Sequence, residues 1–271
     1  MFEFLLIIIG VFAGFLSGLL GIGGGLVFIP ILFYMFTSQG VANPVVYAVA
    51  TSLFCVILVS ASSTIKHIQQ QNFSLKESAW IGGFGAIGTY FGKQITTSDQ
   101  FSEKEFAVIF AGILLYTAYS FLKSPKKNVG HSKPPIEVKW SSGLLVGGLG
   151  GFVAALTGLG GGIVMVPMLN FIYHKPFNQV VSLSSAAIFI ISIAAVVQYS
   201  FSSLTSTAIS SVNLGYVDFG VGLPLAVGGM LGAGQGAKYA MTVNKALLKR
   251  IFAGLAIFEA IRLLAAHLLD L

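Results

Sequence analysis

Two glycine-rich stretches stand out as residues whose type and spacing could do chemistry. The first reads GFLSGLLGIGGGLVFIPIL over Gly14–Leu32, and the second reads GFVAALTGLGGGIVMVPML over Gly151–Leu169. Aligned without a gap, 10 of the 19 positions are identical. Each stretch is an apolar run that is interrupted by Gly-x-Gly-Gly-Gly and, five residues later, by a proline. Because consecutive glycines disfavour helix, each stretch is predicted to hold a helix break and then a short helix.

The chemistry that such a break favours is the binding of a small anion. A helix that begins just after Gly23-Gly24-Gly25 presents unpaired backbone N–H groups and the positive end of its dipole. If Gly160-Gly161-Gly162 brought a second helix start to the same point, the two starts would hold an anion without a buried lysine or arginine. Close helix packing is the alternative role for these glycines. A dinucleotide fingerprint is excluded because no soluble βαβ context surrounds them.

Two pairs of hydroxyl side chains form a second candidate set. Thr51-Ser52 and Ser184-Ser185 lie at similar distances after the two glycine breaks. Hydroxyl groups donate hydrogen bonds to oxyanions, so both pairs are predicted to face the same cavity as the glycines. The alternative is that each hydroxyl bonds back to its own helix.

Three ionisable residues lie in otherwise apolar stretches and are candidates for coupling transport to H⁺ or Na⁺. Glu259 and Arg262 are one helical turn apart, and Asp218 lies near the start of its apolar segment. Ionisable residues inside a membrane are functional candidates, although for Glu259 and Arg262 a structural ion pair is the favoured interpretation.

Other kinds of site find little support. The four histidines His67, His131, His174 and His267 lack the spacing of metal ligands. No nucleophile–base set and no Walker motif is visible, so neither an enzyme, a cofactor nor a metal is expected. The single cysteine, Cys55, fits a small core residue.

The composition indicates a polytopic helical membrane protein. Hydrophobic residues make up 55% of the 271 residues, only 9% are charged, and the mean hydropathy is +0.88. No Asp, Glu, Lys or Arg occurs from Phe4 to Ile65 or from Pro176 to Val217. One membrane span needs roughly 20 apolar residues, so each run exceeds a single span. The net charge of +6 is read as lysines that flank the membrane rather than as a nucleic-acid surface.

The chain divides into two homologous halves, residues 1–122 and 140–271, joined by a hydrophilic linker at 123–139. About eight long membrane helices and two short half-helices are expected. The long spans are predicted at 2–20, 45–65, 78–95, 106–122, 140–156, 180–199, 215–236 and 247–269, and the half-helices at 26–36 and 163–173. A helix of 11 residues is only about 16 Å long, so these two segments are half-helices rather than full spans.

The lysines favour an inverted arrangement of the halves. The linker carries five lysines and one glutamate, which places it in the cytoplasm. If each half-helix counts as a crossing, the halves are inverted and the basic 238–250 segment is cytoplasmic too. If the half-helices are re-entrant, the repeats are parallel and that segment lies outside, against the positive-inside rule. We therefore favour inverted repeats with both termini outside.

The doubled glycine motif, the hydroxyl pairs and the final LKRIFAGLAIFEAIRLL segment resemble the sulfite exporter TauE/SafE family of membrane permeases, over nearly the whole chain. This resemblance implies secondary transport of small sulfur-containing anions such as sulfite, thiosulfate or organosulfonates across the bacterial inner membrane. The partners expected are such an anion, the lipid bilayer and a coupling ion, with no nucleic acid. Alternatives are a passive anion channel, a carrier of a small carboxylate, a membrane enzyme and a non-transporting assembly factor.

Overall fold

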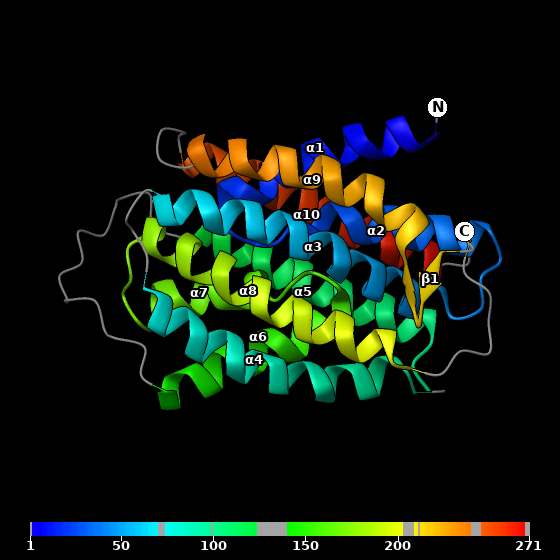
Figure 1. Cartoon of the computed structure of the whole chain (residues 1–271), viewed down its shortest axis with the longest axis horizontal. Coiled ribbons are helices and arrows are strands. Elements are labelled where there is room, and N and C mark those ends of the chain that lie inside the picture. The colour runs from blue at the N-terminus through cyan, green and yellow to red at the C-terminus, as the bar shows by residue number, and fades with distance from the viewer. Residues whose placement is uncertain are drawn as a thin grey trace.

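The computed structural model describes residues 2–69, 74–98, 100–123, 140–202, 209–210, 212–239 and 245–268. Within these ranges the chain forms ten helices and one two-stranded hairpin (Figure 1). The helices are α1 Phe2–Leu20, α2 Gly25–Ser38, α3 Pro44–Gln69, α4 Leu75–Thr96, α5 Glu103–Lys123, α6 Trp140–Thr157, α7 Gly162–Phe171, α8 Phe177–Ser200, α9 Phe219–Tyr239 and α10 Lys245–Leu268. The antiparallel strands are β1 Asn213–Leu214 and β2 Val217–Asp218.

The helices fall close to the predicted spans, and the all-α class is confirmed apart from the short hairpin. The predicted start of the span at 215 is wrong, because residues 213–218 form the hairpin and α9 begins at Phe219. By length and composition, three helical segments could cross a membrane: Glu3–Leu20, Pro44–Gln69 and Gln179–Ser200. The linker segment 124–139 lies outside the described residues.

Helices from the two halves pack side by side in matching pairs. In one pair α1 packs along α9, and in the other α4 packs along α6. A Cβ atom on Gly14 would clash with the backbone of Gly229, and one on Gly151 would clash with the backbone of Gly85. Glycine at these positions therefore lets the backbones touch, and the halves are interlocked rather than separate.

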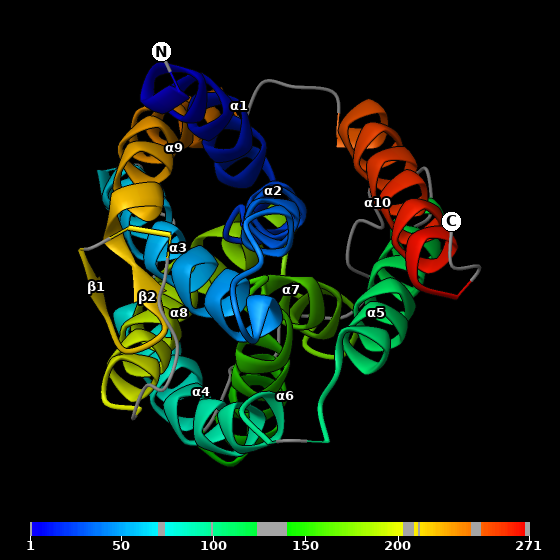
Figure 2. The ribbon, with the colours of Figure 1, turned by 90° about the vertical axis from the view of Figure 1, so that its right-hand side faces the viewer.

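Two long helices form the centre of the bundle. Helix α3 packs against both α8 and α9, and α8 packs against both α3 and α4. The pair α5–α10 lies to one side of this bundle, as the end-on view shows (Figure 2). Helix α1 begins and α10 ends at the same end of the molecule, which is the right-hand end in Figure 1.

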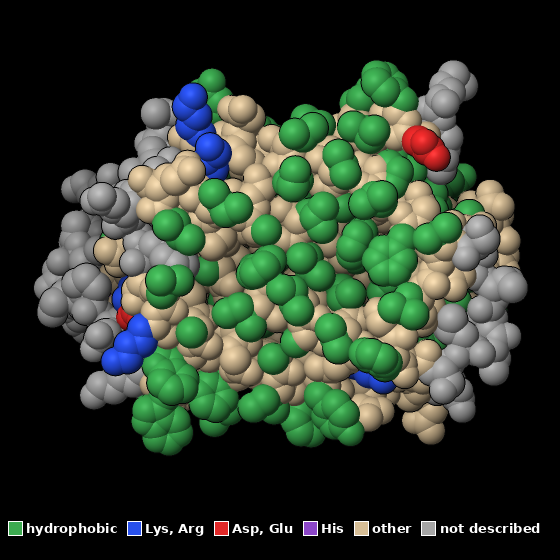
Figure 3. All heavy atoms as spheres, viewed as in Figure 1, with side chains coloured by type: hydrophobic (Ala, Val, Ile, Leu, Met, Phe, Trp, Pro, Cys, Tyr) green, Lys and Arg blue, Asp and Glu red, His purple; other side chains and the backbone are tan. Residues whose placement is uncertain are grey.

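The outer surface is apolar over its middle. In Figure 3 hydrophobic side chains cover the central band of the visible face, while the few charged side chains lie mostly toward its ends. Large exposed side chains include Phe4, Phe91, Leu145 and Phe258, the last of which is 65% exposed. Such a surface is costly in water and is matched by hydrocarbon, which fits a protein embedded in a membrane.

Candidate functional site

The two glycine breaks share one backbone conformation. Helix α1 ends at Leu20 and α2 begins at Gly25, while α6 ends at Thr157 and α7 begins at Gly162. In both breaks the first, third and fourth residues have positive φ, between 69° and 91°. These residues are Gly21, Gly23 and Gly24 in the first break and Gly158, Gly160 and Gly161 in the second. Other L-residues rarely adopt this conformation, so glycine is needed for the chain to turn here.

The two breaks lie directly against each other. A Cβ atom built on Gly160 would be 3.8 Å from the Cα of Gly23. One built on Gly25 would be 2.5 Å from the Cα of Leu159, and one on Gly162 would be 2.6 Å from the Cα of Ile22. The starts of α2 and α7 therefore meet in the interior of the molecule. We call the residues of the two breaks, 21–25 and 158–162, the glycine centre.

The first backbone donors of both short helices have no acceptor. Within the described part of the chain, the N–H groups of Gly25, Leu26, Gly162 and Ile163 donate no hydrogen bond. All four residues are buried. The next N–H in each helix does bond, from Val27 to Gly24 O and from Val164 to Gly161 O, both at 3.1 Å. Buried N–H groups without partners are rare in proteins, so the glycine centre offers four donors to a ligand.

Each half holds the break of the other half by a hydroxyl. The Ser52 Oγ on α3 donates to the carbonyl oxygen of Gly158, and the Ser184 Oγ on α8 donates to that of Gly21, both at 2.9 Å. These contacts pair Ser52 with Ser184, one residue away from the pairing expected from the sequence. Ser52 is the ninth residue of α3, whereas Ser184 is the eighth residue of α8.

Two apolar side chains close the glycine centre. Cβ atoms built on Gly23 and Gly160 would lie 3.0 to 3.3 Å from Cγ1 of Val56 and Cγ2 of Ile188. Val56 and Ile188 lie one turn after Ser52 and Ser184, so they occupy matching positions on α3 and α8. Both side chains are fully buried. Sequence reasoning missed them, because a valine and an isoleucine inside an apolar helix carry no signal of their own.

The other hydroxyls of the predicted site make contacts elsewhere. The Thr51 Oγ1 accepts a hydrogen bond from the Asp218 N–H at 3.1 Å. The Ser185 Oγ lies 3.2 Å from the Ser63 Oγ. Of the hydroxyl residues, the structure therefore brings Ser52 and Ser184 against the glycine centre.

The candidate coupling residues lie apart from the glycine centre. Asp218 is fully buried, and its carboxylate accepts hydrogen bonds from the N–H groups of Ser210 and Val221, which caps the start of α9. Glu259 and Arg262 form an ion pair of 3.3 Å on α10, the helix that packs along α5. Among the described residues, no group of three or more His, Cys, Asp or Glu side chains could hold a metal ion.

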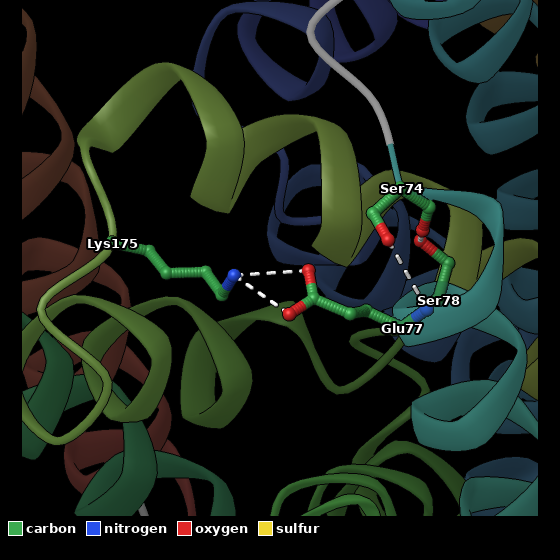
Figure 4. Close-up of polar contacts among 4 residues, drawn as sticks. All are labelled: Ser74, Glu77, Ser78 and Lys175. Atoms are coloured by element: carbon green, nitrogen blue, oxygen red, sulfur yellow. Dashed lines mark hydrogen bonds and ion pairs between the residues drawn. The ribbon is translucent and has the colours of Figure 1, made fainter. Parts of the chain in front are cut away.

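A buried ion pair joins the two halves at one end of the molecule. Lys175, which follows α7, donates to both carboxylate oxygens of Glu77 in the first turn of α4, at 2.7 and 2.9 Å (Figure 4). Both side chains are 7% exposed. Nothing in the sequence pairs these two residues, which lie 98 positions apart.

Comparison with known proteins matches this architecture to one family. The family model described as sulfite exporter TauE/SafE matches residues 6–263. A probable membrane transporter protein of Methanocaldococcus jannaschii is 32% identical over 238 residues, which cover 83% of this chain and 84% of the relative.

Two bacterial relatives carry the same description. A probable membrane transporter protein of Bacillus subtilis, YunE, is 27% identical over 250 residues, with 86% of each chain covered. One of Xylella fastidiosa is 27% identical over 257 residues, which cover 93% of this chain and 91% of the relative. No solved structure matches the chain.

Proposed function

We propose that this chain, which belongs to the sulfite exporter TauE/SafE family of membrane transporters, is a secondary carrier of small anions. Its substrates would be sulfur oxyanions such as sulfite, thiosulfate or organosulfonates, moved across the bacterial inner membrane by a multi-pass protein. The proposal rests on the glycine centre and on the family.

The observation that carries the proposal is the set of four buried N–H groups at the facing starts of α2 and α7. Each helix start adds the positive end of its dipole, so the two starts favour a negative solute between them. A sulfur oxyanion has several acceptor oxygens around one centre and can accept from both helices at once. Backbone donors also suit a substrate that must leave again, because no fixed positive charge holds it.

The directions of the helices support an inverted arrangement of the halves. Three contacts run in order along α3 and along the segment from the end of β2 through α9: Thr51 with Asp218, Cys55 with Gly222, and Ser62 with Met230. Helix α9 is therefore parallel to α3, whereas α4 runs in the opposite direction to α3 in Figure 1, with α8 between them. Since α4 and α9 carry the matching Gly88-x-x-x-Gly92 and Gly232-x-x-x-Gly236 motifs, counterpart helices run in opposite directions. Inverted repeats that meet at broken helices are the pattern of many secondary transporters.

The apolar contacts at the glycine centre suggest how access could alternate. Val56 and Ile188 touch both breaks, so substrate entry requires α3 or α8 to move away from the breaks. The hydrogen bonds of Ser52 and Ser184 tie each long helix to the break of the other half. We propose that one half rocks against the other, with these two side chains withdrawing in turn.

Two other functions use the same architecture. A passive channel would pass anions through the same centre without an occluded state. A carrier of a small carboxylate would use the same donors, because a carboxylate accepts hydrogen bonds as a sulfonate does. Counterflow in proteoliposomes separates carrier from channel: a carrier preloaded with thiosulfate should take up labelled thiosulfate in a saturable manner, whereas a channel should not.

A thermal-shift screen of the purified protein tests the anion site. Thiosulfate, sulfite, sulfoacetate and acetate would be compared with glycerol and choline at equal ionic strength. A ligand that binds the folded state at 100 times its Kd stabilises by about 2.7 kcal/mol, which raises the melting temperature by several degrees. We expect sulfur oxyanions to give the largest shift. Stabilisation by choline or glycerol alone, with none by any anion, would contradict the proposal.

The coupling hypothesis has its own test. If Glu259 carries a proton during transport, the Glu259→Gln variant should lose the dependence of uptake on a pH gradient while keeping counterflow. Glu105→Gln, which changes an exposed glutamate at the start of α5, is the control. Unchanged pH dependence in Glu259→Gln would leave the Glu259–Arg262 pair with a structural role only.

A further inference from the structure

The Lys175–Glu77 ion pair is buried although it lies at helix ends, where charged side chains usually reach solvent. The ammonium group lies 2.7 and 2.9 Å from the two carboxylate oxygens, and little of either side chain reaches the surface. Figure 4 shows the two side chains extended toward each other from separate segments. Removing two charges from water is costly, and apolar pairs of the same volume often serve stability as well or better. The pair therefore invites a role beyond stability.

Its place in the fold links the pair to the glycine centre. Helix α7 begins at Gly162 in that centre, and Lys175 follows its end at Phe171. The ten residues of α7 span about 15 Å. Hydrogen bonds from Lys175 N to Leu169 O, and from Asn170 Nδ2 to Lys175 O, fasten the lysine backbone to the end of this helix. A movement of α7 would therefore displace both the glycine centre and the Lys175 end of the ion pair.

A buried polar face of α3 runs from the glycine centre toward the same end of the molecule. Val56, Ser60, Ser63 and His67 lie at i, i+4, i+7 and i+11, so they share one face of the helix. All four are buried. Ser63 meets Ser185 across this face at 3.2 Å. Helix α3 ends at Gln69, and α4 begins at Leu75, two residues before Glu77.

The matching described positions in the other half do not repeat this arrangement. The matching face of α8 carries Ile188, Ser192, Ala195 and Tyr199. Ala195 stands at the position of Ser63, and Tyr199, whose hydroxyl donates to Ala155 O, stands at the position of His67. By the glycine motif of α9, the counterpart of Glu77 is Val221. The segment that follows α2, residues 39–43, has no charged residue. The opposite end has a buried carboxylate of its own, Asp218, but backbone N–H groups and not a lysine satisfy it. Among the described residues, a buried lysine–carboxylate pair is therefore found on one side of the glycine centre.

We propose that Lys175 is an anion subsite on the path between the glycine centre and this end of the protein, and that Glu77 is its built-in competitor. The transported anion takes the place of the Glu77 carboxylate on the Lys175 ammonium group as it passes. When the subsite is empty, Glu77 returns and closes this end. The inference rests on the proposed function, since it assigns a second anion contact to the same transport path.

Thiosulfate uptake into proteoliposomes tests the subsite, because KM and the maximal rate are measured separately for each variant. In Glu77→Gln the competing carboxylate is gone, so KM should fall about tenfold and the maximal rate should fall, because release from Lys175 is no longer assisted. In Lys175→Met KM should rise. The double variant Glu77→Gln/Lys175→Met leaves no unpaired buried charge; it should fold like the parent protein and keep the high KM.

Controls and contrary outcomes separate this inference from the proposed function. Lys76→Met and Glu105→Gln change exposed residues in the first turns of α4 and α5 and should leave KM and rate unchanged. If the parent protein shows no saturable thiosulfate uptake, the proposed function fails. If the parent transports and the double variant has parental KM and rate, the ion pair is only structural and the subsite is refuted. A raised KM in Glu77→Gln also refutes it.

Discussion

Replacing Ile188 by glutamate is expected to abolish transport while leaving the protein folded. The Cδ1 of Ile188 would lie 2.8 Å from a Cβ on Gly162, so a glutamate here brings its carboxylate to the start of α7. That carboxylate should accept from the unpaired N–H groups of Gly162 and Ile163 and act as a tethered anion. Hydrogen bonds to a charged group contribute about 1.5–3 kcal/mol each. Uptake should fall below about a tenth of the parental rate, a change equivalent to about 1.4 kcal/mol or more, and thiosulfate should no longer raise the melting temperature.

The neutral variant Ile188→Gln is the matched control, with the same length and no charge. An unpartnered buried charge costs several kcal/mol. The stability of Ile188→Glu relative to Ile188→Gln therefore depends on whether backbone donors satisfy the new carboxylate. If the donors reach the side chain, Ile188→Glu should melt at or above the temperature of Ile188→Gln. A melting temperature for Ile188→Glu many degrees lower, or stabilisation by thiosulfate in both variants, would count against the glycine centre as the anion site.

Alanine at Gly25 or Gly162 is expected to cause the second large loss. A methyl group on Gly25 meets the backbone of Leu159, and one on Gly162 meets that of Ile22, so the two breaks must separate. Overpacking against rigid backbone typically costs about 1–3 kcal/mol. We expect a melting temperature several degrees lower and uptake reduced more than about tenfold, because the two sets of donors no longer face one point.

Glycines with open space around them serve as controls for this effect. A Cβ on Gly83 or Gly112 would meet nothing within 4 Å, and both residues lie inside helices. Alanine there should be neutral or stabilise by about 0.5–1 kcal/mol, since glycine weakens a helix interior. If Gly25→Ala behaves like Gly83→Ala in stability and uptake, the breaks are not in functional contact.

Much of this architecture could be predicted from the sequence because membrane helices leave strong local signals. Long apolar runs set the spans to within a few residues, and the repeated Gly-x-Gly-Gly-Gly placed both helix breaks where the structure has them. The prediction that the two breaks meet came from their repetition, and their direct contact is confirmed. The hairpin at 213–218 was missed because two-residue strands carry no periodic pattern.

The details of the site depend on contacts that no local pattern encodes. The sequence alignment matches Thr51-Ser52 with Ser184-Ser185, but in the structure Ser52 is the counterpart of Ser184, one residue away. A shift of one residue turns a side chain by 100° about a helix axis, and Thr51 accordingly contacts the start of α9. The ion pair of Lys175 and Glu77 joins the segment after α7 to the first turn of α4, which only the tertiary fold brings together.

The most direct test of the central claim is the chemical shift of a single amide at the start of α7. The sequence contains three Gly–Ile steps, at Ile22, Ile113 and Ile163, so labelling glycine carbonyls with ¹³C and isoleucine nitrogens with ¹⁵N yields three amide signals. On titration with thiosulfate, the Ile163 amide proton should move downfield as its N–H gains an acceptor, while Ile113, inside α5, should stay unchanged. Saturable binding of thiosulfate with no movement of the Ile163 signal would contradict the account.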